Sequence, residues 1–474
     1  MPKPAVWNNE PECGHEVASI YQTHYCTYIR VPRLLTLPQF SKPDDLILIT
    51  ACQWHELWHK VLLTDLRAAL ADDCATYEPV KLLKRGIELL KLFDTHADLI
   101  ETVAVRDAKL TQPVRAADVT TVSGQFAEIL TLSRQLPRLA RQPMTGLAEA
   151  VHDYRARLKN FRPRYNKFLK ATLTPKKSSA PTYAEWLKLP DLLSLQDGVR
   201  AGWVEKGGQP AEYWKPDRLI PDEMMFVVVH QCFEVWFKVM LDHIDRALPL
   251  LMNGDVRAAH HLLGRLLPIQ RMLVQQIQIP ATMLPLDFLR FRSMSRERDG
   301  ATVHTGLSPA SGTESYQFRE IEIVCGLRDD PAFRNFLSGS DRLAMRPITS
   351  KQSERLNRPT LPEALRQAMT LRGLERYDDL FTAANAPNPH ADLAALADAL
   401  LEFDEFFRFW RLGHISMVEK MIGAKSGTGF LGSEYLMETA GIKTQEHNRV
   451  FDEPQFRPRF FEELWAVRTR MGSY

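Results

Sequence analysis

The stretch MMFVVVHQCFEVWFKVMLDHIDRALPLL, Met224 to Leu251, decides the fold because it reads as one long amphipathic helix. Its apolar residues recur at spacings of three and four, the period of an α-helix with one buried face. The same spacing recurs in Leu46 to Leu70, Leu82 to Thr102 and Phe403 to Ile422, whereas alternating strand-like runs are scarce. The sequence therefore predicts an all-α protein.

Part of this stretch has a counterpart earlier in the chain. Eight of its residues match residues 178 positions before them, namely Gln231, Glu234, Trp236, Lys238, Val239, Leu241, Ala247 and Leu248 against Gln53, Glu56, Trp58, Lys60, Val61, Leu63, Ala69 and Leu70. Tyr25 to Tyr28 recurs 158 residues later at Tyr183 to Trp186, and SGQFAEI (Ser123 to Ile129) recurs 192 residues later as SYQFREI. The growing spacing indicates one duplication with later insertions near 199–218 and 293–305, the alternative being chance similarity between amphipathic helices.

The duplication predicts three parts of the chain. Residues 1–170 form a degenerate helical repeat, called here the first copy, and residues 183–474 form the second copy. The stretch ATLTPKKSSAPT, 171–182, is predicted to be a linker because its prolines, serines and threonines interrupt the helical period. The second copy continues for about 150 residues beyond the last match, and we expect no counterpart of that extension in the first copy.

Composition and charge narrow the classes of protein. The chain has 474 residues, of which 45% are hydrophobic and 25% charged, as in an ordinary globular protein. A net charge of +2 makes nucleic acid an unlikely partner. We find no apolar run long enough to suggest a membrane span and no signal peptide. The six scattered cysteines favour reduced thiols, so we expect a cytoplasmic protein without a membrane partner.

Three segments of the second copy carry candidate functional residues. Phe226 and His230 fall on one helical face, although a lone histidine there is more often part of the core. Phe288 and Arg292 are four residues apart, so an aromatic ring and a guanidinium could receive a carboxylate-bearing aromatic ligand, the alternative being a surface salt bridge.

The third segment is FWRLGHISMVEKM, which places His414 on an apolar helical stripe with Trp410, Met417 and Val418. Such a stripe can be ordinary core, or it can supply one imidazole to iron and cover a porphyrin face. The glycine-rich loop that follows contains Thr428 and could approach a small ligand closely, or could simply end the helix.

The segment His55-Glu-Leu-Trp-His59 satisfies the HExxH pattern of zinc peptidases. Its counterpart in the second copy is Phe233-Glu-Val-Trp-Phe237, so both histidines replace phenylalanines. This substitution favours packed core positions over a zinc site.

Taken together, the second-copy motifs resemble the tryptophan 2,3-dioxygenase family. The matching stretches are FVVVHQCFEVWFK, LDFLRFR, LSPASGTESYQFR, FWRLGHISMVEKMIGAKSGTG and, more weakly, YAEWLKLPDLLSLQ, in family order over about 180 to 440. The resemblance implies an all-helical, haem-binding bundle, here preceded by the degenerate repeat. It also implies haem b as cofactor, an aromatic amino acid and O2 as substrates, and a homo-oligomer, dimer or tetramer.

The resemblance also implies a role for each candidate residue. His414 would be the proximal iron ligand, with Trp410, Ser311 and Gly429 also contacting the haem. His230 would be the distal, catalytic histidine near the indole nitrogen. The remaining substrate-binding residues would be Phe226 and Phe288 at the indole, Arg292 at the carboxylate, Thr428 at the amino-acid end, and Tyr183, Trp186 and Leu187 in a segment that closes a neighbouring subunit's pocket.

The family reaction implied is insertion of both atoms of O2 across the indole C2–C3 bond, giving N-formylkynurenine. Four departures from the family pattern leave the substrate open: Phe430 to Leu436 after the GTG triplet, the insertion after Arg292, Trp186 in place of the usual tyrosine, and the whole first copy. A haem-dependent mono-oxygenase acting on a modified tryptophan or tyrosine, and a non-catalytic haem-binding protein, are the alternatives.

The first copy has Leu48 and Cys52 where the second has Phe226 and His230, so we expect it to bind no haem. Our hypothesis is that it imitates a partner subunit and delivers Tyr25 and Tyr28 to the site of the second copy.

Overall fold

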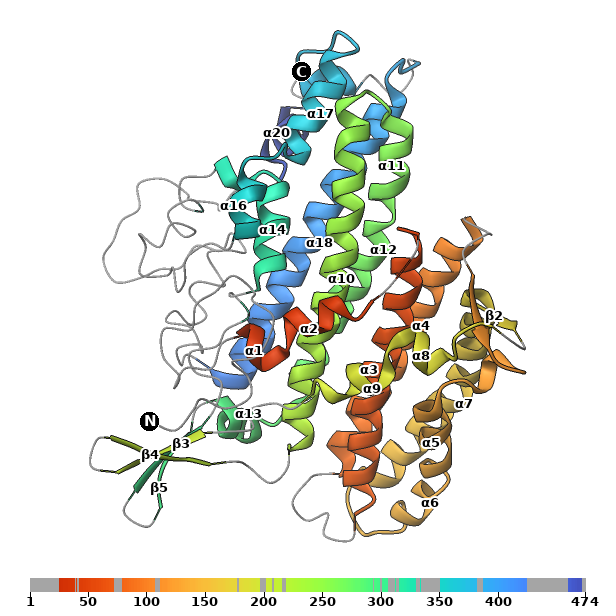
Figure 1. Cartoon of the computed structure of the whole chain (residues 1–474), viewed down its shortest axis with the longest axis vertical. Coiled ribbons are helices and arrows are strands. Elements are labelled where there is room, and N and C mark those ends of the chain that lie inside the picture. Colours follow the sequence, from red (N-terminus) through yellow and green to blue (C-terminus); the bar gives the residue numbers. More distant parts are fainter. Residues whose placement is uncertain are drawn as a thin grey trace. The chain divides into compact units, whose positions relative to one another are not determined.

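A computed structural model describes residues 25–38, 40, 42–71, 79–106, 111–176, 179–196, 202–206, 209–214, 219–292, 294–298, 301–305, 312, 315–329, 333, 350–381, 387–423 and 459–470 (Figure 1). Its α-helices are α1 (Tyr25–Ile29), α2 (Val31–Thr36), α3 (Asp45–Ala69), α4 (Pro79–Arg106), α5 (Gly124–Leu132), α6 (Leu136–Leu139), α7 (Leu147–Thr172), α8 (Tyr183–Leu187), α9 (Leu189–Ser194), α10 (Pro221–Met252), α11 (Val256–Gly264), α12 (Leu266–Gln276), α13 (Pro285–Arg292), α14 (Tyr316–Val324), α16 (Ser350–Leu356), α17 (Leu361–Thr370), α18 (Ala391–Ile422) and α20 (Glu462–Arg470). Short 3-10 turns and two small sheets complete the described part.

The four long helices predicted from periodicity are all present as α3, α4, α10 and α18, and the mainly helical fold class is confirmed. One of them, α10, is long and apolar enough to cross a membrane, which the sequence analysis did not anticipate. However, 83% of its most apolar window is buried inside the protein, and core helices of soluble proteins pass the same test, so this is weak evidence for a membrane span.

The contacts divide the chain into two compact units, each described by itself. The first unit contains residues 19–236 and 275–310, and the second contains 237–274 and 311–474. In the first unit α3 packs against α4 and α5, and α4 packs along α7 (Figure 1). Its centre is aromatic, with Trp54, Trp58, Phe93 and Phe161 fully buried.

In the second unit, the remainder of α10 and helices α11, α14, α16, α17, α18 and α20 form the core. Helix α11 packs against α18, and α14 packs against α16. Arg355 of α16 joins these elements by donating to Glu320 at 2.9 Å and to Asp245 at 2.6 Å.

The predicted linker is only partly a loop. Helix α7 continues to Thr172, and strand β2 (Leu173–Lys176) follows it and pairs in parallel with β1 (Gln112–Arg115). The pairing buries Leu173 and Val114, to 2% and 0% exposure, so the first half of the stretch belongs to the first copy's packing. Long-range pairing of this kind leaves no mark in local composition.

The two predicted insertions of the second copy form one sheet. Strands β3 (Gly202–Lys206) and β4 (Gln209–Trp214) make one hairpin, and β5 (Met294–Arg298) and β6 (Ala301–Thr305) make another. Antiparallel pairing of β3 with β6 joins them in the order β4-β3-β6-β5. The second hairpin follows directly after α13, the helix that ends at Arg292.

Local features recur at the spacings that the duplication hypothesis uses. Arg30 and Lys188, 158 residues apart, both have left-handed backbone conformations, with φ values of 59° and 54°, between two short helices. Ser123 and Ser315, 192 residues apart, cap α5 and α14, each accepting the amide of the third following residue at 3.2 Å. The hypothesis therefore gains structural parallels beyond the matching letters.

One aromatic contact of the first unit resembles a contact that the His414 helix makes in the second unit. In the second unit Phe318 of α14 lies 6.0 Å from Phe407 and 5.3 Å from Trp410 of α18, between ring centroids. In the first unit Phe126 of α5 lies 5.9 Å from Phe161 of α7. Phe168 stands seven residues beyond Phe161, as His414 stands seven beyond Phe407.

Candidate active site

The start of α10 contains the aromatic cluster, defined here as Phe226, His230, Phe288 and Phe291. The ring of Phe226 lies 4.4 Å from that of His230, 5.7 Å from Phe288 and 5.3 Å from Phe291, between centroids. Within 221–237 every residue is buried except Phe226 and His230, which remain partly exposed. The sequence-predicted pair is therefore the part of this helix available to a ligand.

The hydrogen bond of His230 fixes its tautomer. Its Nδ1 lies 2.7 Å from the carbonyl oxygen of Phe226, which can only accept, so Nδ1 carries the proton. Burial lowers the pKa of His230 to about 4, and this hydrogen bond only partly opposes the shift. At neutral pH the ring is uncharged, and Nε2 is a hydrogen-bond acceptor.

Helix α13 brings Phe288 and Arg292 to the same region of the first unit. Phe288 meets Phe226, and both Phe288 and Arg292 are partly exposed. Burial lowers the pKa of Arg292, but a guanidinium still remains charged near neutral pH. One helix thus presents a ring and, four residues later, a cation.

The first copy contributes two tyrosines to the wall of this cluster. The Tyr25 hydroxyl donates to Glu234 Oε1 at 2.9 Å, and its ring meets His230 edge-on at 5.8 Å. The Tyr28 hydroxyl donates to Glu223 at 3.4 Å, and its ring lies 6.4 Å from Phe226. Both tyrosines are buried, at 5% and 4% exposure, against the second copy's helix.

Of Tyr183, Trp186 and Leu187, predicted to bind substrate, the first and third form hydrogen bonds with the first copy. The Tyr183 hydroxyl donates to Glu56 of α3 at 3.2 Å, and Gln53 Nε2 donates to the Leu187 carbonyl at 3.1 Å. The reciprocal bonds are Tyr25 to Glu234 and Gln231 Nε2 to the Ile29 carbonyl at 2.9 Å. The two tyrosine-bearing segments are thus exchanged between α3 and α10 within one chain (Figure 1).

His414 lies in the second unit on α18, with its ring 5.5 Å from that of Trp410. The helix is buried at Phe403 and Phe407, yet all five residues from Trp410 to His414 are partly exposed, as are Met417 and Val418. An imidazole on a partly exposed apolar face suits a planar apolar group with a metal at its centre. Among the described residues, His414 and Trp410 are the ones that would hold a porphyrin. Ser311, Thr428 and Gly429 lie outside the described residues.

The HExxH histidines lie in the first copy's interior. His55, His59 and His96 are all fully buried, and His55 Nε2 lies 3.0 Å from His96 Nδ1. Rings of Phe93, Phe161, Tyr165 and Phe168 surround His55. No group of three or more metal-binding side chains occurs among the described residues.

Sequence reasoning missed the acidic residues at the start of α10. Asp222, Glu223 and Glu234 are buried to 1%, 7% and 0% exposure, and each accepts hydrogen bonds from the first copy. Buried acids in the middle of apolar helices were the available signal, since such groups need partners.

An uncharged histidine among aromatic rings with a nearby cation in the first unit, and an imidazole on a partly exposed apolar helix face in the second, are features that a helical haem-binding oxygenase would use. A family model described as tryptophan 2,3-dioxygenase matches residues 171–370. Relatives of that name include one from Nocardioides sp. (strain ATCC BAA-499 / JS614), 35% identical, for which the match covers 61% of this chain and 94% of the relative.

Others come from Herpetosiphon aurantiacus, at 30% identity, and Caulobacter vibrioides, at 29%, each matched over 61% of this chain and 98% of the relative. The chain belongs to the tryptophan 2,3-dioxygenase family. About 39% of it (100% minus 61%) lies outside each of these matches.

Proposed function

We propose that the protein is a haem-dependent oxidoreductase that inserts both atoms of O2 into the indole ring of tryptophan or a close derivative. The proposal rests on one observation above all. His230 is an uncharged imidazole whose Nε2 is an acceptor, and it lies against Phe226 on the partly exposed part of α10. That arrangement can receive an indole, whose ring is apolar and whose nitrogen is a donor.

His414 would hold haem b, with Trp410 covering the porphyrin, and Ser311 and Gly429 are further proposed contacts. When bound, the haem iron supplies the site at which O2 is activated. The half-buried imidazole and apolar face of α18 support this assignment.

The chain's own residues would bind and orient the substrate. Phe226 and Phe288 would contact the indole with their exposed edges, and His230 Nε2 would accept the indole N–H. Arg292 would bind the carboxylate through its planar pair of donors. Fixing both ends of the amino acid sets the angle at which the C2–C3 bond meets oxygen, which is where orientation accelerates a reaction. Thr428 remains a proposed contact to the amino-acid end.

Tyr25 and Tyr28 would close this site from within the same chain. Their contacts with Glu234, Glu223, His230 and Phe226 support that role. Tyr183 and Leu187 would then be structural, because their hydrogen bonds are with α3.

The relatives' common name supports dioxygenation over the mono-oxygenase and non-catalytic alternatives. We further propose a cytoplasmic homo-oligomer. The four described cysteines, Cys26, Cys52, Cys232 and Cys325, are buried thiols, which is consistent with a reducing compartment.

The function is tested with purified protein supplied with haem, reductant, tryptophan and isotopically labelled O2. We expect a Soret band and a product carrying two labelled oxygens. A product with one labelled oxygen would replace the proposal by mono-oxygenation, and a haem protein that turns over no indole or phenol amino acid would leave only haem binding. A colourless protein would overturn the proposal altogether.

A further inference from the structure

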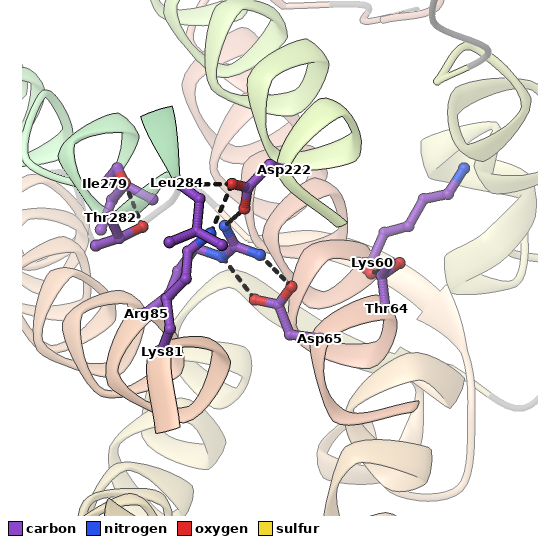
Figure 2. Close-up of polar contacts among 9 residues, drawn as sticks. All are labelled: Lys60, Thr64, Asp65, Lys81, Arg85, Asp222, Ile279, Thr282 and Leu284. Atoms are coloured by element: carbon purple, nitrogen blue, oxygen red, sulfur yellow. Dashed lines mark hydrogen bonds and ion pairs between the residues drawn. The ribbon is translucent and has the colours of Figure 1, made fainter. Parts of the chain in front are cut away.

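A buried ion cluster joins the first copy to the start of α10 (Figure 2). It consists of Asp65 on α3, Lys81 and Arg85 on α4, and Asp222 on α10. Arg85 binds the Asp65 carboxylate through two nitrogens, Nε at 2.7 Å and a terminal nitrogen at 2.5 Å. Its other terminal nitrogen donates to Asp222 Oδ1 at 2.5 Å.

Both oxygens of Asp222 are occupied. Oδ2 accepts from Lys81 Nζ at 2.6 Å and from the backbone amide of Leu284 at 2.7 Å. Leu284 immediately precedes α13, and its carbonyl accepts the amide of Phe288 at 3.0 Å in the first turn of that helix. A single carboxylate therefore ties the beginning of α13 to the beginning of α10.

These two helix starts carry the aromatic cluster. Phe226 stands one turn after Asp222, and Phe288 stands one turn after Leu284, with 5.7 Å between their ring centroids. Arg292 follows one turn beyond Phe288. A change in how Asp222 is held would consequently change the spacing of residues from both helices.

The first copy makes the buried carboxylate tolerable. Asp222 is 1% exposed, and burial alone would raise its pKa, but the charges of Arg85 and Lys81 outweigh burial and lower it. Arg85 is fully buried and held by Asp65, so two cations face two anions. Removing one partner of such a cluster leaves an uncompensated charge in the protein interior, and this strongly destabilises the fold around it.

Asp65 itself is not repeated at the matching position. At the spacing of 178, the residue matching Asp65 is His243, although Asp245 of α10 binds Arg355 through two nitrogens in the second unit. The exchanged tyrosines occur in both directions, whereas the carboxylate of Asp65 serves the second copy's helix start.

We propose that Lys81 and Arg85 of the first copy are positioning residues that act through Asp222 to hold α10 and α13 at the spacing that tryptophan binding needs. This deepens the proposed function and rests on it. The first copy then positions α10 and α13 of the site, in addition to placing two tyrosines beside it.

The main test replaces Lys81, whose side chain is 13% exposed, in the full-length haem-supplied protein. For Lys81→Met and Asp222→Asn we expect the dissociation constant and KM for tryptophan to rise about tenfold, with a much smaller change in kcat. Displacing a site by about 1 Å can cost up to about 10²-fold. Arg85→Lys should retain more affinity than Arg85→Met, because it keeps one charge beside Asp222.

Arg164→Met is the matched control, because Arg164 also pairs with acids of α4, Asp94 and Asp98, but on the surface of the first copy. A general loss of stability would affect all variants in proportion to their melting temperatures. If Lys81→Met and Asp222→Asn bind tryptophan as wild type does, the positioning role is wrong while the proposed function stands.

A second readout does not depend on activity. Hydrogen exchange of the peptide spanning 284–292 should be faster in Lys81→Met and Asp222→Asn than in wild type, and unchanged in Arg164→Met. Unchanged exchange in all three variants would overturn the inference, whether or not the wild-type protein oxidises tryptophan. If exchange is faster in Lys81→Met and Asp222→Asn but the wild-type protein oxidises no tryptophan, the proposed function is wrong and the link between Asp222 and α13 stands.

Discussion

The first turns of α10 and the matching turns of α3 make similar contacts with the other copy but bury different side chains. Glu234 and Glu56 each accept a hydrogen bond from a tyrosine of the other copy's leading segment. Facing inward, α10 presents Phe233 and Phe237, while α3 presents His55 and His59. The contacts that hold the copies together are thus shared, and the chemistry that each copy encloses has been free to diverge.

The largest expected effect is loss of haem from a variant of α18, the helix compared above with α7. His414→Ala should abolish haem retention, because an alanine provides no ligand to iron, just as Phe168 provides none at the comparable place in α7. The absorbance ratio of the Soret band to protein measures this directly. Retained haem with an unchanged spectrum would mean that another side chain holds the iron.

Arg292→Met should raise the KM for tryptophan by about 10- to 100-fold while leaving haem content unchanged. Hydrogen bonds to charged groups contribute about 1.5–3 kcal/mol, and about 1.4 kcal/mol is tenfold in affinity. Tryptamine, which has no carboxylate, should bind wild type and variant equally. A variant that lost affinity for tryptamine as strongly would point to a damaged site instead.

The first copy's interior should be sensitive to acid. Burial, followed by the neighbouring His96 and His59, lowers the pKa of His55 well below its usual value, and burial lowers that of His96 to about 3. Below about pH 6.5 the unfolded chain binds protons that the folded one does not. Stability is therefore complete above that pH and falls by up to about 1.4 kcal/mol per pH unit for each imidazole as pH drops.

Acid unfolding followed by circular dichroism measures this slope. In a His55→Leu/His96→Leu double variant, the free energy of unfolding should depend less steeply on pH between 6 and 4 than in wild type, because the variant's interior, like that of the second copy, has apolar residues in place of these imidazoles. The exposed His152 provides the control, since His152→Leu should leave the slope unchanged. Identical slopes in all three proteins would show that the buried imidazoles are protonated without cost.

His230→Phe replaces the partly exposed polar residue within 221–237 of α10 by an apolar one. We expect KM to rise about two- to tenfold, the usual range for one neutral hydrogen bond. Because the pKa of His230 is about 4, its acceptor nitrogen is lost only as pH falls toward that value, so its contribution should be constant from pH 6 to 8. An inflection near pH 6.5 that disappears in the variant would contradict the uncharged state.

The smallest effect compares the exchanged tyrosines. Tyr25→Phe should raise the KM for tryptophan about two- to fivefold, through loss of the bond to Glu234 beside His230. Tyr183→Phe removes the equivalent bond to Glu56 and should lower the melting temperature with a smaller effect on KM. If Tyr183→Phe had the larger effect on KM, the closing segment would be the second copy's own.

Much of this could be predicted from sequence because it depends on local patterns. Periodicity located α3, α4, α10 and α18, and the family motifs pointed to His230 and His414. The similar aromatic contact of α7 was not predicted because no sequence motif of α7 matches that of α18. The Asp222 cluster was missed because its members are up to 157 residues apart (222 minus 65) and only the fold brings them together.

The four-stranded sheet makes each of the two inserted hairpins dependent on the other for backbone hydrogen bonds. Strand β3 from the first hairpin is bonded on one side by β4 and on the other by β6 from the second hairpin. Deleting either hairpin would strip its neighbour of a bonding partner and leave an open strand edge, a template for aggregation. Shortened versions of this enzyme should therefore tolerate the loss of both hairpins together better than the loss of one.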